Sequence, residues 1–148
     1  FAFNQLRSIH HQISSPTLPK LVHRALDMPL HWRPIRYEAR WYIDLYKEDK
    51  DMNPCLIKFA MLDFNIVQSL HQKEISRLIG WWASTGMDKL PFARNCIIQS
   101  YMYAIGILFE PHFGEIRELE AKIGAIISVV DDVYDAYGTV EELQLFTD

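Results

Sequence analysis

The sequence predicts an all-α protein built from antiparallel helices that are joined by short loops. Apolar residues recur at helical spacings of three and four along most of the 148 residues, and strand-like alternation is scarce. Residues that start and stop helices stand between these periodic stretches. Hydrophobic residues make up 49% of the chain, which supplies a sizeable core and argues against intrinsic disorder.

Three helices are expected in the first fifty residues. They are an amphipathic stretch over 1–15 that Ser14, Ser15 and Pro16 end, a second helix from Thr17 to Met28, and a third over 35–47. The polar run 47–51 then predicts a solvated loop, and it is the best candidate for a boundary between domains. We therefore expect one domain to include residues 1–50 and a second to include 53–148.

A long helix is expected to follow this loop. Asn53 is a good N-cap and Pro54 suits the first helical position, so the helix should begin here and end near Gly86. Its apolar stripe, which we expect in the core, consists of Leu56, Ala60, Phe64, Val67 and Leu70.

Two more long helices complete the predicted bundle. One opens at Leu90-Pro91 and stops at Glu110-Pro111, and the next begins at Glu115. Gly138 is placed to cap the second of these helices in a left-handed conformation. Thr139 and Glu142 then match a capping box that starts another helix.

Acidic residues gather at the end of the helix that begins at Glu115. The run Ile123 to Val130 is apolar on every side, which predicts a buried helix, and its last turn carries Asp131, Asp132 and Asp135. Three carboxylates at the negative end of a helix repel one another unless a cation or water faces them. Carboxylate oxygens suit Mg²⁺, which commonly bridges one or two carboxylates to phosphate groups. The alternative is a solvated acidic helix end; the buried helix that leads into it favours a site.

Several classes of function fit the sequence poorly. The net charge of −4 argues against a nucleic-acid partner, and no apolar run approaches the roughly 20 residues of a membrane span. Cys55 and Cys96 fit neither a disulfide framework nor a CxxC metal pattern. The spacing after Asp131 is not that of a calcium-binding EF-hand loop. Because the chain begins with Phe1 and ends at Asp148 inside a predicted helix, we expect it to be part of a longer protein.

Six motifs together resemble plant class I terpene synthases, in the order in which that family has them. They are PLHWRPIRYEARW (29–41), KFAMLDFNIVQSLHQKEI (58–75), GWW (80–82), KLPFAR (89–94), Glu110-Pro111 and DDVYDAYGTVEELQLFTD (131–148). The subgroup that the chain resembles most is the angiosperm group rich in monoterpene synthases. The resemblance implies the class I terpenoid synthase fold, with residues 1–50 from the end of the helical N-terminal domain and 53–148 from the first half of the metal-binding catalytic domain.

The same resemblance implies an enzyme that uses Mg²⁺ or Mn²⁺ to ionise a prenyl diphosphate. In this subgroup the substrate would be geranyl diphosphate and the product a monoterpene, with release of diphosphate. Metal ions suit this reaction because the departing diphosphate gains negative charge in the transition state. Carried over by position, Asp131 and Asp135 would bind the metal, and Asp132 would pair with a basic residue. Arg94 holds the first position of the family's Arg-x-Arg diphosphate motif; otherwise it is a solvated arginine.

The resemblance also implies residues that line the substrate pocket. Tyr103 lies where the family often has a tryptophan, and aromatic faces stabilise carbocations. The alternative for Tyr103 is a core tyrosine. Ile127 and Ser128, one turn before Asp131, would form the pocket floor. The resemblance further implies a monomer in the plastid, with the cytosol as the other candidate compartment.

Two departures from the family pattern matter. Cys96 stands where the second arginine of the Arg-x-Arg motif is expected, and a thiol cannot bind phosphate as a guanidinium does. The family's second metal motif would lie beyond Asp148, so we expect the 148-residue chain alone to be inactive and to expose apolar helix faces.

Two other functions are weighed against a terpene synthase. An enzyme that joins prenyl units would need basic residues just after the aspartates, where this chain has Tyr137-Gly138-Thr139 and two glutamates. A catalytically inactive helical protein, retained as a binding partner or encoded by a pseudogene, agrees with Cys96 and with the missing motif.

Overall fold

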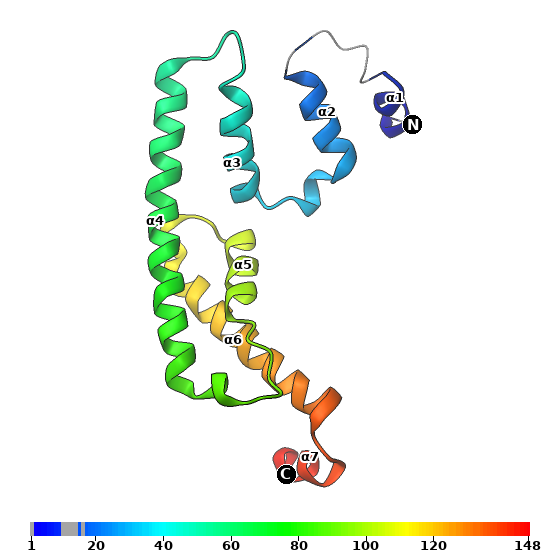
Figure 1. Cartoon of the computed structure of the whole chain (residues 1–148), viewed down its shortest axis with the longest axis vertical. Helices are drawn as coiled ribbons and strands as arrows, with labels where there is room; N and C mark the ends of the chain where they lie inside the picture. Colours follow the sequence, from blue (N-terminus) through cyan, green and yellow to red (C-terminus); the bar gives the residue numbers. More distant parts are fainter. Residues whose placement is uncertain (1, 10–14, 16) are drawn as a thin grey trace. The chain divides into compact units, whose positions relative to one another are not determined.

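The computed structural model describes residues 2–9, 15 and 17–148, and within these ranges every regular element is helical. This agrees with the predicted all-α class. The elements in chain order (Figure 1) are α1 (Ala2–Ile9), α2 (Leu18–Asp27), η2 (Leu30–Trp32), α3 (Ile35–Tyr46), α4 (Pro54–Thr85), η3 (Met87–Lys89), α5 (Ile97–Ile107), η4 (Pro111–Phe113), α6 (Gly114–Asp132), η5 (Val133–Tyr137) and α7 (Val140–Thr147). Among the described residues, no helix is both long enough and apolar enough to cross a membrane.

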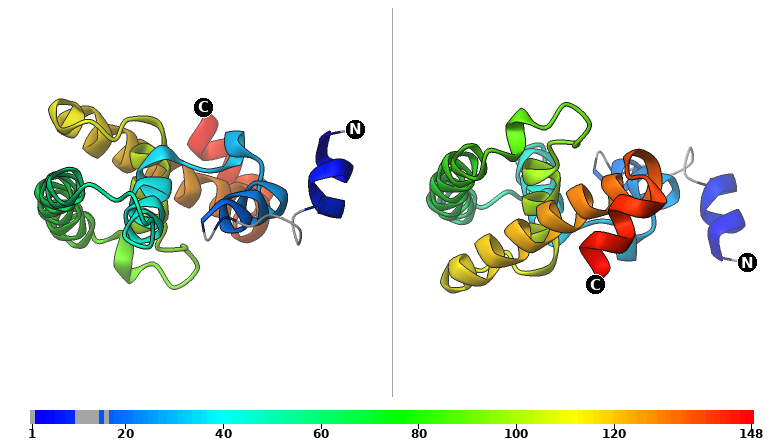
Figure 2. Two further views of the ribbon diagram at one scale, coloured as in Figure 1. Left: turned by 90° about the horizontal axis from the view of Figure 1, so that it is seen from above. Right: turned by 90° about the horizontal axis from the view of Figure 1, so that it is seen from below.

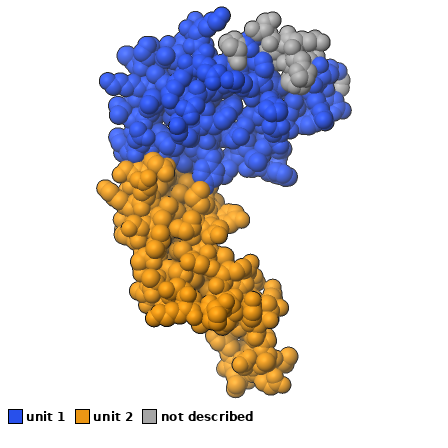
Figure 3. Space-filling view, viewed as in Figure 1, with its two compact units in different colours: residues 1–66 blue, residues 67–148 orange. Residues whose placement is uncertain are grey.

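The chain forms two compact units, residues 1–66 and 67–148 (Figure 3). Helix α4 contributes to both, because it spans the division between them. The polar run 47–51 lies in the loop between α3 and α4, as predicted. The assignment of residues 1–50 and 53–148 to two domains stays a prediction, because the division into compact units falls within α4.

The long helix α4 begins and ends where the sequence predicts. The side-chain oxygen of Asn53 accepts hydrogen bonds from the backbone N–H groups of Cys55 (2.9 Å) and Leu56 (3.2 Å), which satisfies two unpaired donors of the first turn. Gly86 follows the last residue with φ 74°, a left-handed conformation that favours glycine. The predicted core stripe is confirmed only in part: Val67 is buried, whereas Ala60, Phe64 and Leu70 are partly buried. Leu56 is 54% exposed, and Ile57 is the buried residue of that turn.

In the unit of residues 1–66, arginine side chains connect α2, α3 and α4. Glu38 on α3 accepts hydrogen bonds from Arg24 (2.7 Å) and Arg33 (2.6 Å). Arg36 packs its guanidinium 3.8 Å from the ring centre of Phe64 on α4 and donates to the Phe64 carbonyl at 2.6 Å. Burial lowers the pKa of Arg36, although nearby Asp63 acts in the opposite direction.

The core of the unit of residues 67–148 lies between α4, α5 and α6. Helices α5 and α6 lie side by side (Figures 1 and 2) and approach closely because small residues face the contact. A Cβ atom on Gly124 would be 3.1 Å from the hydroxyl of Ser100 on α5. The buried residues of this core are Leu78, Trp82, Ile97, Tyr101, Ile105, Ala121, Ala125 and Val129.

A buried ion pair crosses this core. Arg117 on α6 donates two hydrogen bonds to Glu74 on α4, at 2.9 and 2.7 Å, and Tyr101 on α5 donates a third at 2.6 Å. Arg117 also donates to the carbonyls of Leu108 (2.9 Å) and Glu110 (2.6 Å), which lie after the end of α5. These contacts satisfy polar groups that would be costly to bury alone, so the network connects all three helices.

The pKa values in this network move in the directions that its contacts favour. Burial alone would raise the pKa of Glu74, but hydrogen bonds from Arg117 and Tyr101 and the charge of Arg117 bring it below its ordinary value. Burial and the hydrogen bond to Glu74 raise the pKa of the Tyr101 phenol. The carboxylate and the neutral phenol are therefore the stable forms near neutral pH.

Two expectations for the helices around the acidic residues are wrong. Helix α5 begins at Ile97 and not at Pro91, because residues 91–96 are irregular and contact the end of α6 instead. The run 123–130 is not buried on all sides: Ala125 and Val129 are buried, whereas Ile123 is 49% and Ile127 is 61% exposed. Within this unit α5 covers one face of α6, and the opposite apolar face stays open to solvent. The expected exposure of apolar helix faces is confirmed.

Candidate functional site

The three aspartates lie where α6 changes from an α-helix to a wider π turn. Asp131 and Asp132 end α6, and Asp135 lies within η5, the five-residue π turn Val133–Tyr137. Single π turns of this kind are rare and frequently occur at functional sites. The sequence predicts one continuous α-helix here, and nothing in the apolar spacing marks the change of register.

Gly138 ends this turn for a different reason from the one expected. Its φ is −77°, so it is not a left-handed cap. Its backbone N–H donates to the Val133 carbonyl at 2.7 Å, which closes the π turn. A Cβ atom would lie 2.8 Å from that carbonyl oxygen and 2.7 Å from the side chain of Leu143, so close packing requires glycine. The capping box of Thr139 and Glu142 that follows is confirmed.

Arg94 is the cation that faces the acidic helix end. Its backbone N–H donates to one carboxylate oxygen of Asp132 at 2.9 Å, and its side-chain Nε donates to the other oxygen at 2.6 Å. A longer contact of 3.4 Å joins its terminal nitrogen to Asp131. The hydrogen bond to Asp132 raises the pKa of Arg94, which therefore stays charged. Arg94 thus neutralises Asp132 before any other cation binds.

Asp131 and Asp135 are the carboxylates left open to solvent. The side chain of Asp131 is 57% exposed, against 10% for Asp132, and Asp135 is also exposed. Among the residues that the structure describes, no group of three or more acidic, histidine or cysteine side chains gathers as a complete metal site. Mg²⁺ does not require one, because it usually takes one or two carboxylates and completes its shell with water and phosphate oxygens. The donor set of Asp131 and Asp135 fits such an ion.

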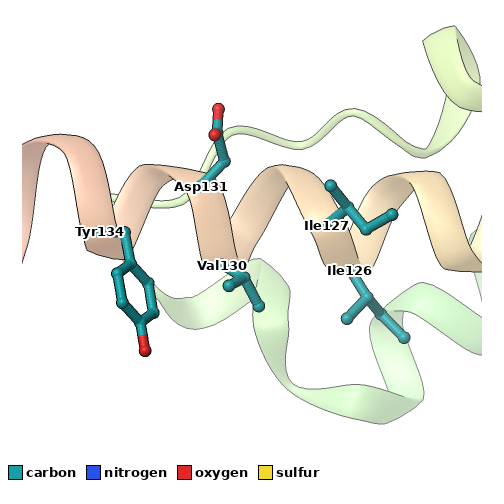
Figure 4. A pocket seen from close by; sticks show the side chains of 5 residues that line it. All are labelled: Ile126, Ile127, Val130, Asp131 and Tyr134. Carbon is teal, nitrogen blue, oxygen red and sulfur yellow. The ribbon is translucent and has the colours of Figure 1, made fainter. Parts of the chain in front are cut away.

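An apolar hollow of about 420 Å³ opens beside Asp131 (Figure 4). Ile126, Val130 and Tyr134 follow one another along one side of α6 and η5, and Ile127 and Asp131 complete the lining. Ile126, Val130 and Tyr134 were not singled out from the sequence, although their spacing of four predicts one shared face. The hollow places hydrocarbon surface next to an exposed carboxylate.

The other expected pocket residues lie outside this hollow. Ser128 is half-buried, and its hydroxyl donates to the Gly124 carbonyl at 3.0 Å. Tyr103 is 76% exposed on α5, so the alternative that it is a core tyrosine is wrong for this structure. Cys96 directly precedes α5 and is partly buried.

Comparisons with known proteins agree with this geometry. Residues 83–148 match the family model described as "Terpene synthase family, metal binding domain". The whole chain is 51% identical to an alpha-bisabolol synthase of Santalum spicatum and 50% identical to a (+)-alpha-terpineol synthase of Santalum album, and it covers 26% of each. The isoprene synthase of grey poplar (Populus x canescens), solved with three Mg²⁺ ions and dimethylallyl-S-thiolodiphosphate, superposes with a TM-score of 0.92. It is 39% identical, and the match covers 100% of this chain and 28% of that one.

The helical architecture is therefore that of the class I terpenoid synthase fold. The chain belongs to the plant terpene synthase family. It spans about a quarter of the length of the curated relatives that it matches (26%).

Proposed function

We propose that the full-length protein containing this chain is a terpene synthase, a lyase that ionises a prenyl diphosphate and releases diphosphate. The observation that carries this proposal is the end of α6. There Asp132 is neutralised by Arg94, while Asp131 and Asp135 stay exposed beside an apolar hollow. This arrangement joins donors for a hard cation to a surface suited to a hydrocarbon chain.

Each residue has a role in this proposal. Asp131 and Asp135 would hold Mg²⁺ or Mn²⁺, which supplies positive charge to the leaving diphosphate. Arg94 neutralises Asp132 and fixes it at the helix end, and its terminal nitrogen, 3.4 Å from Asp131, would be available to a bound diphosphate. Ile127 and its neighbours in the hollow would exclude water from the hydrocarbon chain. Tyr103 and Ser128 stay predicted pocket residues.

The length of the prenyl chain gives two candidate substrates. Geranyl diphosphate, with a monoterpene product, is our first candidate, and a relative named for alpha-terpineol is 50% identical to the chain. The relatives also include sesquiterpene synthases at nearly the same identity, so farnesyl diphosphate is the second candidate. We further propose a monomer located in the plastid, with the cytosol as the alternative. A fluorescent fusion of the full-length protein and its mass in solution test these two points.

The experiment that tests the function is a product assay on the full-length protein. Purified protein is incubated with geranyl or farnesyl diphosphate. Each mixture contains either MgCl₂ at about 10 mM, which should saturate a weak carboxylate site, or EDTA. We expect volatile terpenes and released diphosphate with one of the substrates, and neither product with EDTA. An absence of product with both substrates and with either Mg²⁺ or Mn²⁺ would favour the inactive helical protein. A longer prenyl diphosphate as the product would indicate chain joining instead.

A further inference from the structure

Residues 92–94 contact the acidic helix end at two places. Arg94 binds Asp132 through its backbone N–H and its side chain, as described above. Two residues earlier, the ring of Phe92 lies 5.3 Å from the ring of Tyr137 at an interplanar angle of 35°. Between them, Ala93 packs against the core of the unit of residues 67–148. The irregular segment 91–96 is thus fixed to both ends of the π turn.

The π turn explains why Tyr137 is the residue that meets Phe92. In an α-helix the residues that lie one turn beyond Asp132 and on its side are Asp135 and Ala136. The π turn is closed by the i→i+5 hydrogen bond from Gly138 to the Val133 carbonyl, so the residues after Asp132 follow a different register, and the ring of Tyr137 at the end of the turn meets Phe92.

The π turn has no buried side chain of its own to stabilise it. Contacts from its aromatic residues do so instead. The Tyr134 hydroxyl is 2.9 Å from that of Thr147 on α7, and Tyr137 packs on Phe92. Since π turns are rare, we expect such contacts from outside the turn to help hold the wider register.

We propose that Phe92 and Tyr137 are positioning residues for the acidic site. Their ring contact holds the segment 92–94 against the end of α6, which keeps Arg94 on Asp132 and leaves Asp131 and Asp135 free for a cation. This inference rests on the proposed function for its catalytic consequence, but the positioning itself is a property of the metal-free protein. Phe92 and Tyr137 would act through Arg94 and the aspartates and not on the metal itself.

The test uses full-length protein with Tyr137→Leu, Phe92→Leu and the double variant, and Tyr137→Phe as the matched control that keeps the ring. Hydrogen exchange of the metal-free proteins is measured at residues 91–96 and 133–138. The Mg²⁺ concentration for half-maximal turnover is measured separately. Each leucine variant should speed exchange in both segments and raise that concentration about 2- to 10-fold, the range that one aromatic pair supports. Tyr137→Phe should match the wild type, and the double variant should be no worse than the single ones.

Three results would overturn the proposal. One is Tyr137→Leu behaving like Tyr137→Phe in both measurements. Another is an additive loss in the double variant, which would mean that the two rings act independently. The third is faster exchange with an unchanged Mg²⁺ requirement, which would make the contact merely structural. If the wild type turned over no prenyl diphosphate, the proposed function would fail, and the exchange data would still decide whether the rings hold the turn.

Discussion

Arg94 contacts both carboxylate oxygens of Asp132, one through its backbone at 2.9 Å and the other through its side chain at 2.6 Å. A single residue thus satisfies the whole carboxylate and fixes a segment 38 residues away in sequence against the end of α6. The three aspartates therefore differ in their roles. Asp132 is already neutralised, whereas Asp131 and Asp135 keep charges that are open to a metal ion.

The first prediction concerns the contact between Arg94 and Asp132. Arg94→Ala and Asp132→Asn should each lower kcat/KM of the full-length enzyme by about 10- to 100-fold, within the range for loss of an interaction that organises charge at a site. The double variant should lose little more than the worse single variant, because both changes break the same contact. Steady-state kinetics of the three variants measure this. Independent losses that multiply would show that Arg94 and Asp132 do not act as a unit.

The second prediction concerns the buried network of Glu74, Tyr101 and Arg117. Arg117→Met should destabilise the α4–α6 core by about 3–5 kcal/mol, because it leaves the Glu74 carboxylate buried without its partner. Tyr101→Phe, which removes one hydrogen bond to that carboxylate, should cost about 1.5–3 kcal/mol. The double replacement Glu74→Leu with Arg117→Met should be less harmful than Arg117→Met alone. Hydrogen exchange of core amides in α4, α5 and α6 measures these differences.

The same network predicts a dependence of stability on pH. The pKa of Glu74 is lowered in the folded protein, so its contribution is present above the unfolded value of about 4.5 and is lost as the pH falls through the folded pKa. The pKa of Tyr101 is raised, so its contribution is present below about 10 and is lost as the pH rises through the folded pKa. Between these two pH limits, the contribution of the network to stability, measured by hydrogen exchange of core amides, should therefore be constant. Glu74→Gln should remove the acid-side dependence, and an unchanged acid limb in that variant would contradict the assignment.

A pair of glycines gives the third prediction. Gly138→Ala should destabilise the segment 133–148 by about 1–3 kcal/mol, because the new Cβ meets a backbone oxygen at 2.8 Å and Leu143 at 2.7 Å. Gly80→Ala is the matched control inside α4, five residues before its end, where a Cβ meets nothing within 4 Å. It should stabilise the helix by about 0.5–1 kcal/mol. Local hydrogen exchange distinguishes the two, and equal effects would contradict the close packing at Gly138.

The fourth prediction concerns Cys96, which stands two residues after Arg94. Cys96→Arg should raise turnover of the full-length enzyme, by about 10-fold if the new guanidinium makes a charge-assisted contact with diphosphate. Cys55→Arg adds the same charge at the exposed start of α4 and should change nothing. Unchanged kinetics for Cys96→Arg would remove the idea that the thiol limits diphosphate binding.

Much of the fold was predictable from local signals. The limits of α4 follow from Asn53, Pro54 and Gly86, and the start of α7 follows from its capping box, because these residues satisfy backbone groups within a few positions of themselves. The start of α5 was not predictable in this way. Residues 91–96 fit a helix by local pattern, but Phe92 and Arg94 contact a helix end that lies about forty residues later.

The features of the candidate site also differ in whether the sequence predicts them. The acidic residues, Arg94 and Ile127 were identified from the sequence, because their residue types and their resemblance to a family point to one chemistry. The π turn was not, since a wider register changes neither composition nor apolar spacing over five residues. The buried ion pair of Glu74 and Arg117 was missed as well. A glutamate and an arginine 43 positions apart give no local signal that they share a core.

The most direct test of the account is the Mg²⁺ dependence of Asp131→Asn and Asp135→Asn in the full-length protein. Each change should lower turnover of the prenyl diphosphate by about 100-fold or more and raise the Mg²⁺ concentration needed for half-maximal activity. Asp88→Asn, an exposed aspartate on η3, should leave both quantities unchanged and serves as the control for loss of one charge. Wild-type turnover and an unshifted Mg²⁺ requirement in both site variants would contradict the assignment of the metal to the end of α6.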